Sequence, residues 1–209
     1  MRNDRDWYYA HKPDYEQYVL KPFQALVAAL APSMLKIDPQ IETSPTVGKT
    51  ISRVYRDARF SRDKSLYRDR AWLTFERKVE SPDVPAFYFE LMPTGYRYGV
   101  GFYNVTVKTM EEYRAMIDRD EKGFLELINT TTGSPAGEFA VEGDLYKRNR
   151  YTGTHPQIAE WYNRRNIYIA ANRRDFSEVY DFDALVSRLE SGFAALAEIY
   201  RFWCKAASI

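Results

Sequence analysis

The sequence predicts an α+β fold in which helices from the N-terminal, middle and C-terminal parts of the chain cover one face of an antiparallel meander sheet. Two observations carry this prediction. Apolar residues recur every three or four positions near both ends of the chain, whereas they alternate with polar residues between positions 51 and 105. A run of strands bracketed by helices is typical of an α+β protein.

The first long helix is predicted over residues 15–30. Its apolar stripe has spacings of three, four and seven, and is formed by Tyr15, Val19, Phe23, Leu26, Val27 and Leu30. Pro22 should kink or restart this helix, and Pro32 and Pro39 should close it into a loop. A short helical turn over residues 6–12 is expected before it.

Four strands are predicted in the segment of period two, at 51–57, 71–77, 86–92 and 97–105. The turn signal Pro93-Thr94-Gly95-Tyr96 joins the last two and pairs Met92 with Arg97. One face of this hairpin then carries only apolar side chains, namely Phe87, Phe89, Leu91, Tyr98, Val100 and Phe102. We expect the helices to cover that face.

The other face of the hairpin is polar and contains two glycines. In the predicted register, Gly99 and Gly101 lie opposite Glu90 and Tyr88. Glycine weakens a strand interior, so a pair of them indicates either a neighbour packed closely against the sheet or the floor of an open groove. The sequence leaves both interpretations open.

The rest of the chain is predicted to alternate between helices and short strands. Residues 110–128 form one or two helices, split near 120–123, and a weaker strand follows at 139–147. A helix over 157–165, a strand over 167–171 and a long final helix over 183–205 complete the expected elements.

Length and composition favour one globular domain over residues 1–209. The chain is 45% hydrophobic and 28% charged, and its net charge of +1 creates no general field for nucleic acid or anionic lipid. Any anion site must therefore be local, and nucleic acid is disfavoured as a partner. Cys204 is the single cysteine, and we find no apolar run of the ~18 residues that span a bilayer and no secretory signal. A cytoplasmic location is expected.

The segment from Arg53 to Arg70 concentrates arginine, lysine, aspartate and tyrosine. On a strand, Arg53, Tyr55 and Asp57 would share one face. If that face is the one with Tyr88, Glu90 and Arg97, a polar groove forms over the two glycines. The candidate ligand-binding residues are therefore Arg53, Arg56, Asp57, Arg59, Asp63, Lys64, Tyr67, Arg68, Tyr88 and Glu90.

These residue types suit a small anionic, phosphate-bearing ligand. Planar arginine forks beside a lysine and a tyrosine can hold phosphate or carboxylate, with Asp57 and Asp63 orienting the guanidinium groups. A surface loop whose charges neutralise one another explains the same residues. Two further hypotheses are an enzyme that uses Glu90 or a cluster aspartate as general base, and a protein–protein interaction module. No catalytic residue is assigned, and the oligomeric state is left open.

Other reactive residues give no pattern of their own. His11 and His155 have no partners at metal-ligand spacing, Cys204 lies among apolar residues, and no glycine-rich phosphate loop occurs. We therefore expect neither a metal nor a cofactor.

Several motifs are similar to those of one family. The run Arg-Val-Tyr-Arg-Asp-Ala-Arg-Phe-Ser-Arg-Asp-Lys-Ser-Leu-Tyr-Arg at 53–68 resembles the signature of domain-of-unknown-function family 2461, which occurs in bacteria and fungi. The opening Asn-Asp-Arg-Asp-Trp-Tyr at 3–8 and Phe87-Tyr88-Phe89 support the resemblance. Ser65-Leu66 stand where that signature leads us to expect Thr-Pro, and the helix expected before Asn3 is absent, which implies a shortened start. The resemblance implies an α+β cytoplasmic protein and no established activity.

Overall fold

The computed structural model describes residues 4–57, 59, 62, 64–81, 83–133 and 139–209. Its centre is a five-stranded antiparallel sheet with strands β1 (Ala71–Phe75), β2 (Pro85–Met92), β3 (Gly95–Phe102), β5 (Tyr168–Arg173) and β4 (Ala140–Glu142) in that spatial order. The predicted α+β class is confirmed. Strands β1, β2 and β3 form the predicted meander. At the other edge of the sheet the spatial order differs from the order in the chain, because β5 lies between β3 and β4.

The β2–β3 hairpin has a tighter turn than the sequence predicts. Pro93 and Thr94 form the whole loop and Met92 pairs with Gly95, so the predicted pairing of Met92 with Arg97 is wrong by two residues. Gly95 has φ +149°, and a side chain there would meet the backbone of Arg173, 2.1 Å from its carbonyl oxygen. Because the side-chain period of a strand is two, the shift leaves both predicted faces intact.

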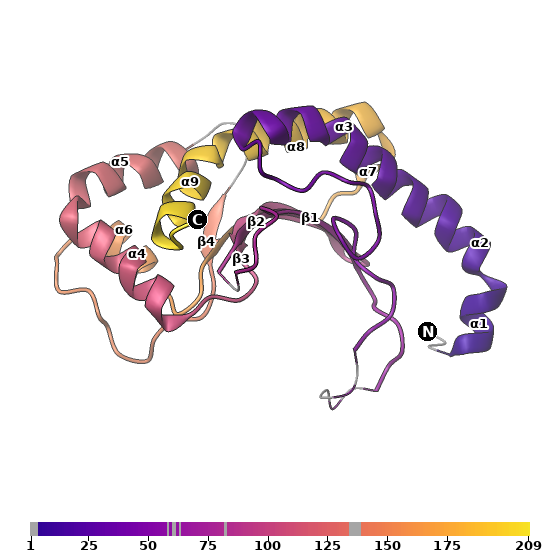
Figure 1. The fold of residues 1–209 in the computed structure, drawn as a ribbon, viewed down its shortest axis with the longest axis horizontal. Helices are drawn as coiled ribbons and strands as arrows, with labels where there is room; N and C mark the ends of the chain where they lie inside the picture. Colours follow the sequence, from indigo (N-terminus) through magenta and orange to yellow (C-terminus); the bar gives the residue numbers. More distant parts are fainter. Residues whose placement is uncertain (1–3, 58, 60–61, 63, 82, 134–138) are drawn as a thin grey trace.

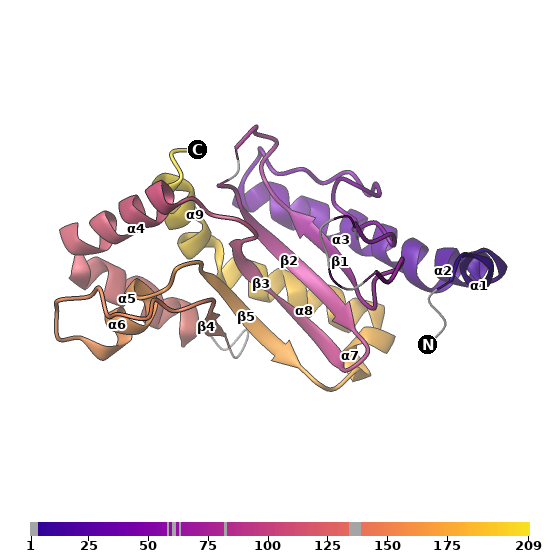
Figure 2. The same ribbon diagram turned by 90° about the horizontal axis from the view of Figure 1, so that it is seen from below.

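Helices cover the apolar face of the sheet, as predicted. α3 (Lys21–Ile37), α8 (Phe182–Ala195) and α9 (Ala197–Ala206) pack on it, against β1, β3 and β2 respectively. Figure 1 shows these helices on one side of the sheet, and Figure 2 shows the strands uncovered on the other side. Fully buried aromatic rings such as Phe87, Tyr98 and Tyr200 fill the space between the layers.

The middle helices lie at one end of the molecule. α4 (Val107–Arg119) and α5 (Glu121–Thr132) pack chiefly against α9, and α6 (Pro156–Tyr162) packs on α5 (Figure 1). Their predicted place over the sheet is therefore corrected to a place beside it. The predicted split is confirmed, because Asp120 ends α4 and its side chain caps α5 by accepting from the Gly123 amide.

The N-terminal helices run into α3 without a loop. α1 (Arg5–Ala10) and α2 (Lys12–Tyr15) lead into a π-helical turn, Glu16–Leu20, directly before Pro22 in the first turn of α3. This turn is the form that the predicted interruption takes. The predicted closure at Pro32 is wrong: α3 continues to Ile37, because burial of the flanking turns offsets the hydrogen bond that proline removes.

Helix length and composition alone would let one described segment, Lys12–Ile37, span a membrane. Core helices of soluble proteins meet the same criterion, and the buried residues of α3 are part of the hydrophobic core: Phe23, Leu26, Val27, Leu30 and Met34.

The C-terminal helix predicted over 183–205 is two helices. The break falls at Leu196, between α8 and α9, and a short helix α7 (Ser177–Tyr180) precedes them. Leu196 is fully buried, so its apolar side chain continues the stripe that predicted one helix. The predicted strands over 139–147 and 167–171 appear as β4 and β5.

The predicted strand 51–57 is wrong in form. These residues pair with 66–74 in an irregular hairpin that projects from β1, which we call the arm (residues 50–70; Figure 1). Ser52 bonds Trp72, and Arg56 bonds Leu66, but three residues, 69–71, oppose residue 53 alone. This bulge breaks the ladder and turns the arm away from the sheet.

Candidate functional site

One side of the arm borders a groove of about 690 Å³, which we call the arm groove. Its lining comes from the arm, from the turn before it and from β1: Gly48, Lys49, Ile51, Ser52, Arg53, Tyr55, Arg56, Asp57, Arg59, Arg68, Trp72 and Thr74. The sequence cluster is thus brought to one place, but only in part.

The described lining of the arm groove is strongly cationic. The described lining holds four arginines and Lys49 but one carboxylate, that of Asp57. Outside the lining, Glu42 lies 3.9 Å from Lys49, and Asp69 is close enough to Arg56 for their charges to interact. Arg59 holds the Asp57 carboxylate with Nη2 2.7 Å and Nε 3.0 Å from its oxygens. These side-chain bonds, followed by the bond from the Arg59 backbone amide, lower the pKa of Asp57 to about 2. Asp57 stays ionised at neutral pH and neutralises one of the cations.

The guanidinium group of Arg53 packs against Gly48. Gly48 has φ +86°, and a Cβ on it would lie 3.1 Å from both Nε and Nη2 of Arg53. The guanidinium therefore packs on the backbone of the turn, where a side chain would push it away. Arg56, three residues further along the arm, donates from Nη1 to Ser65 Oγ at 3.1 Å. The two sides of the arm are thereby tied together.

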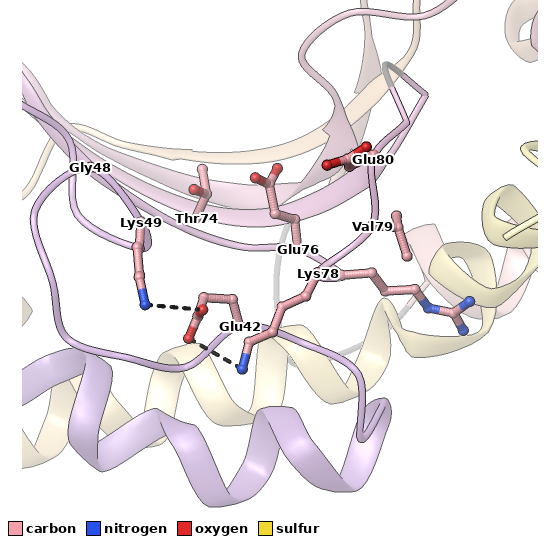
Figure 3. A pocket seen from close by; sticks show the side chains of 9 residues that line it. Glu42, Gly48, Lys49, Thr74, Glu76, Lys78, Val79 and Glu80 are labelled. Carbon is pink, nitrogen blue, oxygen red and sulfur yellow. Dashed lines mark ion pairs between the residues drawn. The ribbon is translucent and has the colours of Figure 1, made fainter.

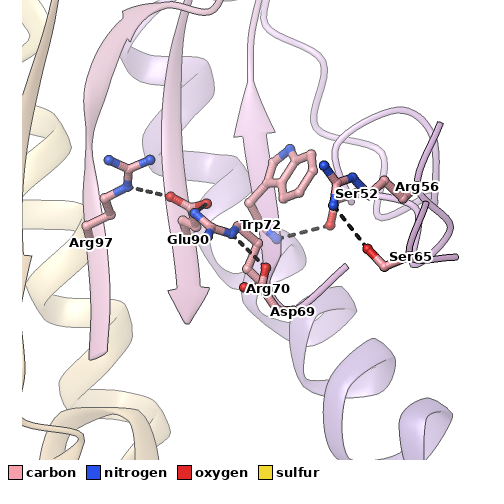
Figure 4. A network of polar contacts seen from close by, with 8 residues as sticks. All are labelled: Ser52, Arg56, Ser65, Asp69, Arg70, Trp72, Glu90 and Arg97. Atoms are coloured by element: carbon pink, nitrogen blue, oxygen red, sulfur yellow. Dashed lines mark hydrogen bonds and ion pairs between the residues drawn. The ribbon is translucent and has the colours of Figure 1, made fainter. Parts of the chain in front are cut away.

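Trp72 supplies the aromatic side of the arm groove. Its amide donates to Ser52 Oγ at 3.0 Å, and its carbonyl accepts from the Ser52 amide at 2.9 Å. The guanidinium carbon of Arg68 lies 4.6 Å from the centre of its ring. In Figure 4, the guanidinium group of Arg56 also points toward the Trp72 ring.

Tyr67 lies on the other side of the arm, against α1. Its ring stacks on Tyr8 at 4.6 Å and lies 5.3 Å from Tyr55, while Tyr8 and Tyr55 meet edge to face at 5.6 Å. Both Tyr8 and Tyr67 are buried. Tyr67 therefore serves to hold the arm to the N-terminal helix and does not line the groove.

Glu90 lies on the sheet face that no helix covers, next to Trp72 across the β1–β2 pair. Its pairing partner on β3 is Arg97, whose Nε donates to it, and Arg70 Nη1 lies 3.3 Å from its other oxygen (Figure 4). With a side chain only 9% exposed, Glu90 is enclosed by two guanidinium groups. Glu90 therefore acts as a structural ion-pair partner. Its contacts with Arg97 and Arg70 join β2 to β3 and to the base of the arm.

The two glycines are covered and do not form an open floor. Tyr88 pairs with Gly99, and its hydroxyl donates across β3 to the Ile169 carbonyl of β5 at 3.3 Å. A Cβ at Gly99 would lie 1.8 Å from that same carbonyl oxygen, and one at Gly101 would meet Tyr168. The predicted alternative of a closely packed neighbour is correct, and the predicted groove over the glycines is wrong.

A second groove, of about 330 Å³, adjoins the arm groove and shares Gly48, Lys49 and Thr74 with it. Its charges are matched. Glu42 lies between Lys49, at 3.9 Å, and Lys78, at 3.5 Å (Figure 3). The Ser44 amide, and then the two lysines, lower the pKa of Glu42. This groove offers an anion no excess of positive charge.

The predicted site residues thus fall into separate groups. Arg53, Arg56, Asp57, Arg59 and Arg68 line the arm groove. Lys64 is exposed on the arm outside the lining described, Tyr67 faces α1, and Tyr88 and Glu90 lie on the sheet face. Asp63 falls outside the described residues.

Seven residues of the described lining were not among the predicted site residues: Gly48, Lys49, Ile51, Ser52, Tyr55, Trp72 and Thr74. Trp72 carried a signal, because an aromatic residue on a strand next to a cation-rich segment can stack with an arginine. Lys49 and Gly48 carried none.

The part of the chain that the structure describes contains no group of residues arranged as a metal site, and its cysteine is not placed as a nucleophile. No group of three potential metal ligands occurs there, His155 begins α6 as its N-cap, and Cys204 is buried. Burial raises the pKa of the Cys204 thiol, which keeps it protonated and unreactive.

The comparison with known families confirms the resemblance in the sequence. Residues 1–202 match the family model described as "Conserved hypothetical protein (DUF2461)". The chain belongs to this family. No curated protein matches it. The family description carries no activity, so the function of this family member must be argued from its geometry.

Proposed function

We propose that the chain binds a small anionic, phosphate-bearing ligand in the arm groove. The observation that supports this most is the excess of cations over carboxylates in the described lining, Lys49 and four arginines against Asp57 alone. Guanidinium groups bind phosphate oxygens with paired hydrogen bonds, and clustered ones raise the local concentration of anions.

Arg68 gives a second argument. Its Nε–H is buried and donates to no acceptor in the described part of the chain. An unsatisfied buried donor costs about 1–3 kcal/mol, and proteins generally provide it with a partner. A phosphate oxygen or an ordered water would supply that acceptor once a shift of the Arg68 side chain exposed this nitrogen to the arm groove.

The other hypotheses receive less support. Glu90 and Asp57 are both held by arginines, which suits ionised structural carboxylates better than a general base. The most exposed tyrosines, Tyr103 and Tyr180, lie on separate elements, which favours isolated surface positions over a docking patch. The cytoplasmic location stays part of the proposal, and cell fractionation tests it.

The test compares pyrophosphate binding to the wild type and to two variants of the arm. Arg53→Gln removes a lining cation, and we expect the dissociation constant to rise about threefold to tenfold, since an exposed ionic contact contributes about 1 kcal/mol. Lys64→Gln removes a cation of the same arm outside the lining, and its dissociation constant should stay within twofold of the wild type.

Isothermal titration calorimetry provides the constants, and thermal unfolding provides a check. At a ligand concentration 100 times the dissociation constant, binding stabilises the fold by about 2.7 kcal/mol, or several degrees in Tm. Comparing variants in one buffer cancels the general effect of salt. Equal losses in both variants, or no binding by the wild type, would contradict the proposal.

A further inference from the structure

The arm groove combines its cations with exposed aromatic surface. Trp72, which is half-buried, supplies this surface. Tyr55 also borders the groove, but its ring packs against Tyr8 and Tyr67 on the other side of the arm. An inorganic anion makes no use of an indole ring, whereas a planar base stacks on one, and also on the plane of an arginine guanidinium. The lining therefore suits a ligand with a planar ring as well as negative charge.

Trp72 is held in place without any ligand. Two backbone contacts with Ser52 fix its main chain on the arm side, and pairing with Glu90 fixes it on the β2 side. Arg68 stacks on the ring, and the guanidinium of Arg56 points toward it (Figure 4). A preorganised ring beside arginines lowers the entropy cost of stacking a ligand there.

The volume of the arm groove agrees with such a ligand. Pockets for molecules of nucleotide size measure about 300–1,000 Å³, and the arm groove has about 690 Å³. Even with Lys49 paired to Glu42, four arginines against Asp57 give the described lining the charge to neutralise more than one negative charge of a phosphate ligand.

We propose that the ligand is a nucleotide, whose phosphates contact the arginines of the arm and whose base stacks against Trp72. This inference rests on the proposed anion binding. A free nucleotide is favoured over a nucleic-acid strand because the chain has a net charge of only +1, and a strand needs cations along an extended path.

Three probes separate the two proposals in the wild-type chain: pyrophosphate, ribose 5-phosphate and ADP. Base stacking contributes enough to expect ADP to bind about tenfold or more tightly than pyrophosphate. Ribose 5-phosphate, which lacks the base, should bind no more tightly than pyrophosphate. A decamer of thymidylate, added as a fourth probe, should bind more weakly than ADP.

Variants of Trp72 locate the base. Trp72→Leu should reduce the affinity for ADP to near that for pyrophosphate measured on the same variant, so that the ratio of the two dissociation constants approaches one. The ratio is the readout because Arg68 stacks on this ring, so the substitution can change pyrophosphate binding as well. Trp72→Phe keeps a ring and should retain part of the gain, which keeps the test usable if the leucine variant unfolds. Trp7→Leu, on α1, is the matched control, because Trp7 stacks on His11 away from the arm groove lining.

Each outcome decides between the proposals. Pyrophosphate binding with no gain for ADP would overturn the nucleotide and leave the anion site standing. A gain for ADP that survives Trp72→Leu and Trp72→Phe would overturn stacking on Trp72. Tighter binding of the decamer than of ADP would replace the free nucleotide by a strand, and binding of none of the probes would overturn both proposals.

Discussion

Asp38 forms the most enclosed ion pair in the described chain outside the candidate site. Its carboxylate is 5% exposed and accepts from Arg77 Nε, from the Tyr200 hydroxyl at 2.8 Å and from the Gln40 amide at 2.9 Å. Burial alone would raise the pKa of Asp38, but these three hydrogen bonds together lower it. The carboxylate joins the end of α3 to α9 and to the chain after β1.

Asp38→Asn should therefore destabilise the fold by about 3 kcal/mol, since removing one charge of a buried pair typically costs 3–5 kcal/mol and Arg77 is partly exposed. Urea unfolding measures the loss. Asp14→Asn, exposed on α2, should change stability by less than about 0.5 kcal/mol. A similar small change in both variants would show that the Asp38 contacts contribute nothing net.

The same residue gives a pH dependence whose sign follows from its lowered pKa. Asp38 contributes stability above the unfolded carboxyl pKa of about 3.9 and loses it as the pH falls through its lower folded pKa. The wild type should thus lose more stability than Asp38→Asn below about pH 4. Parallel curves for the two proteins over that range would exclude this contribution.

Among the elements, the arm depends on a helix far from it in sequence. α1 reaches it through Tyr8, whose ring meets Tyr67 and Tyr55. The arm itself is held by few backbone bonds, including those of the Arg56 and Arg68 amides. Loss of the Tyr8 contacts should therefore loosen the arm before the sheet.

Tyr8→Ala tests this dependence. We expect faster hydrogen exchange at the Arg56 and Arg68 amides, and weaker pyrophosphate binding, although Tyr8 does not line the arm groove. Exchange in β2 and β3 should stay unchanged. The control is Tyr18→Ala, since Tyr18 is 69% exposed on the π-helical turn. Unchanged exchange at the Arg56 and Arg68 amides in Tyr8→Ala would show that the order of the arm does not depend on α1.

Elements with a strong local signal were predicted correctly from the sequence. The faces of the β2–β3 hairpin follow from alternation alone, and the split between α4 and α5 follows from a capping aspartate, Asp120. The hairpin register was wrong because a two-residue and a four-residue loop fit the same turn residues. In the tight turn that forms, the backbone of Arg173 lies close to Gly95, a contact that the local sequence does not show.

Elements set by distant contacts could not be predicted in this way. Residues 51–57 alternate as a strand does, yet their pairing with 66–74 contains a bulge that no local pattern shows. The insertion of β5 beside β3 joins segments about 70 residues apart, for example at Gly99 and Ala170. Neither propensity nor periodicity specifies such a pairing.

At the scale of the whole molecule, the fold brings only some of the predicted site residues to the arm groove, for a physical reason. The cluster between Arg53 and Arg70 alternates its side chains across a hairpin, so one half faces the arm groove and the other half faces α1 or the sheet. Arg53 and Arg56 went to the groove and Tyr67 to the tyrosine contacts, although all three share one motif. Composition was enough to identify the segment from Arg53 to Arg70. The pairing of the hairpin decides which of its side chains face the arm groove and which face α1.

The described core is continuous from α3 to α9, and the single domain stays a prediction that unfolding experiments can test. This core joins Phe23 on α3, Phe87 on β2, Trp161 on α6 and Trp203 on α9 in one buried cluster. Elements that share one hydrophobic core are expected to unfold together. The end of the molecule formed by α4, α5 and α6 should therefore not melt separately.

Four tryptophans report on this cooperativity from four elements: Trp7 on α1, Trp72 on β1, Trp161 on α6 and Trp203 on α9. We expect urea unfolding curves from tryptophan fluorescence and far-ultraviolet circular dichroism to coincide, and the calorimetric and van't Hoff enthalpies to agree. Because Trp7 lies on α1, outside the shared core, Trp7→Phe removes the signal most able to depart from the others. If the two curves still separate in that variant, α6 and its neighbours form a second cooperative unit, and the single-domain prediction is wrong.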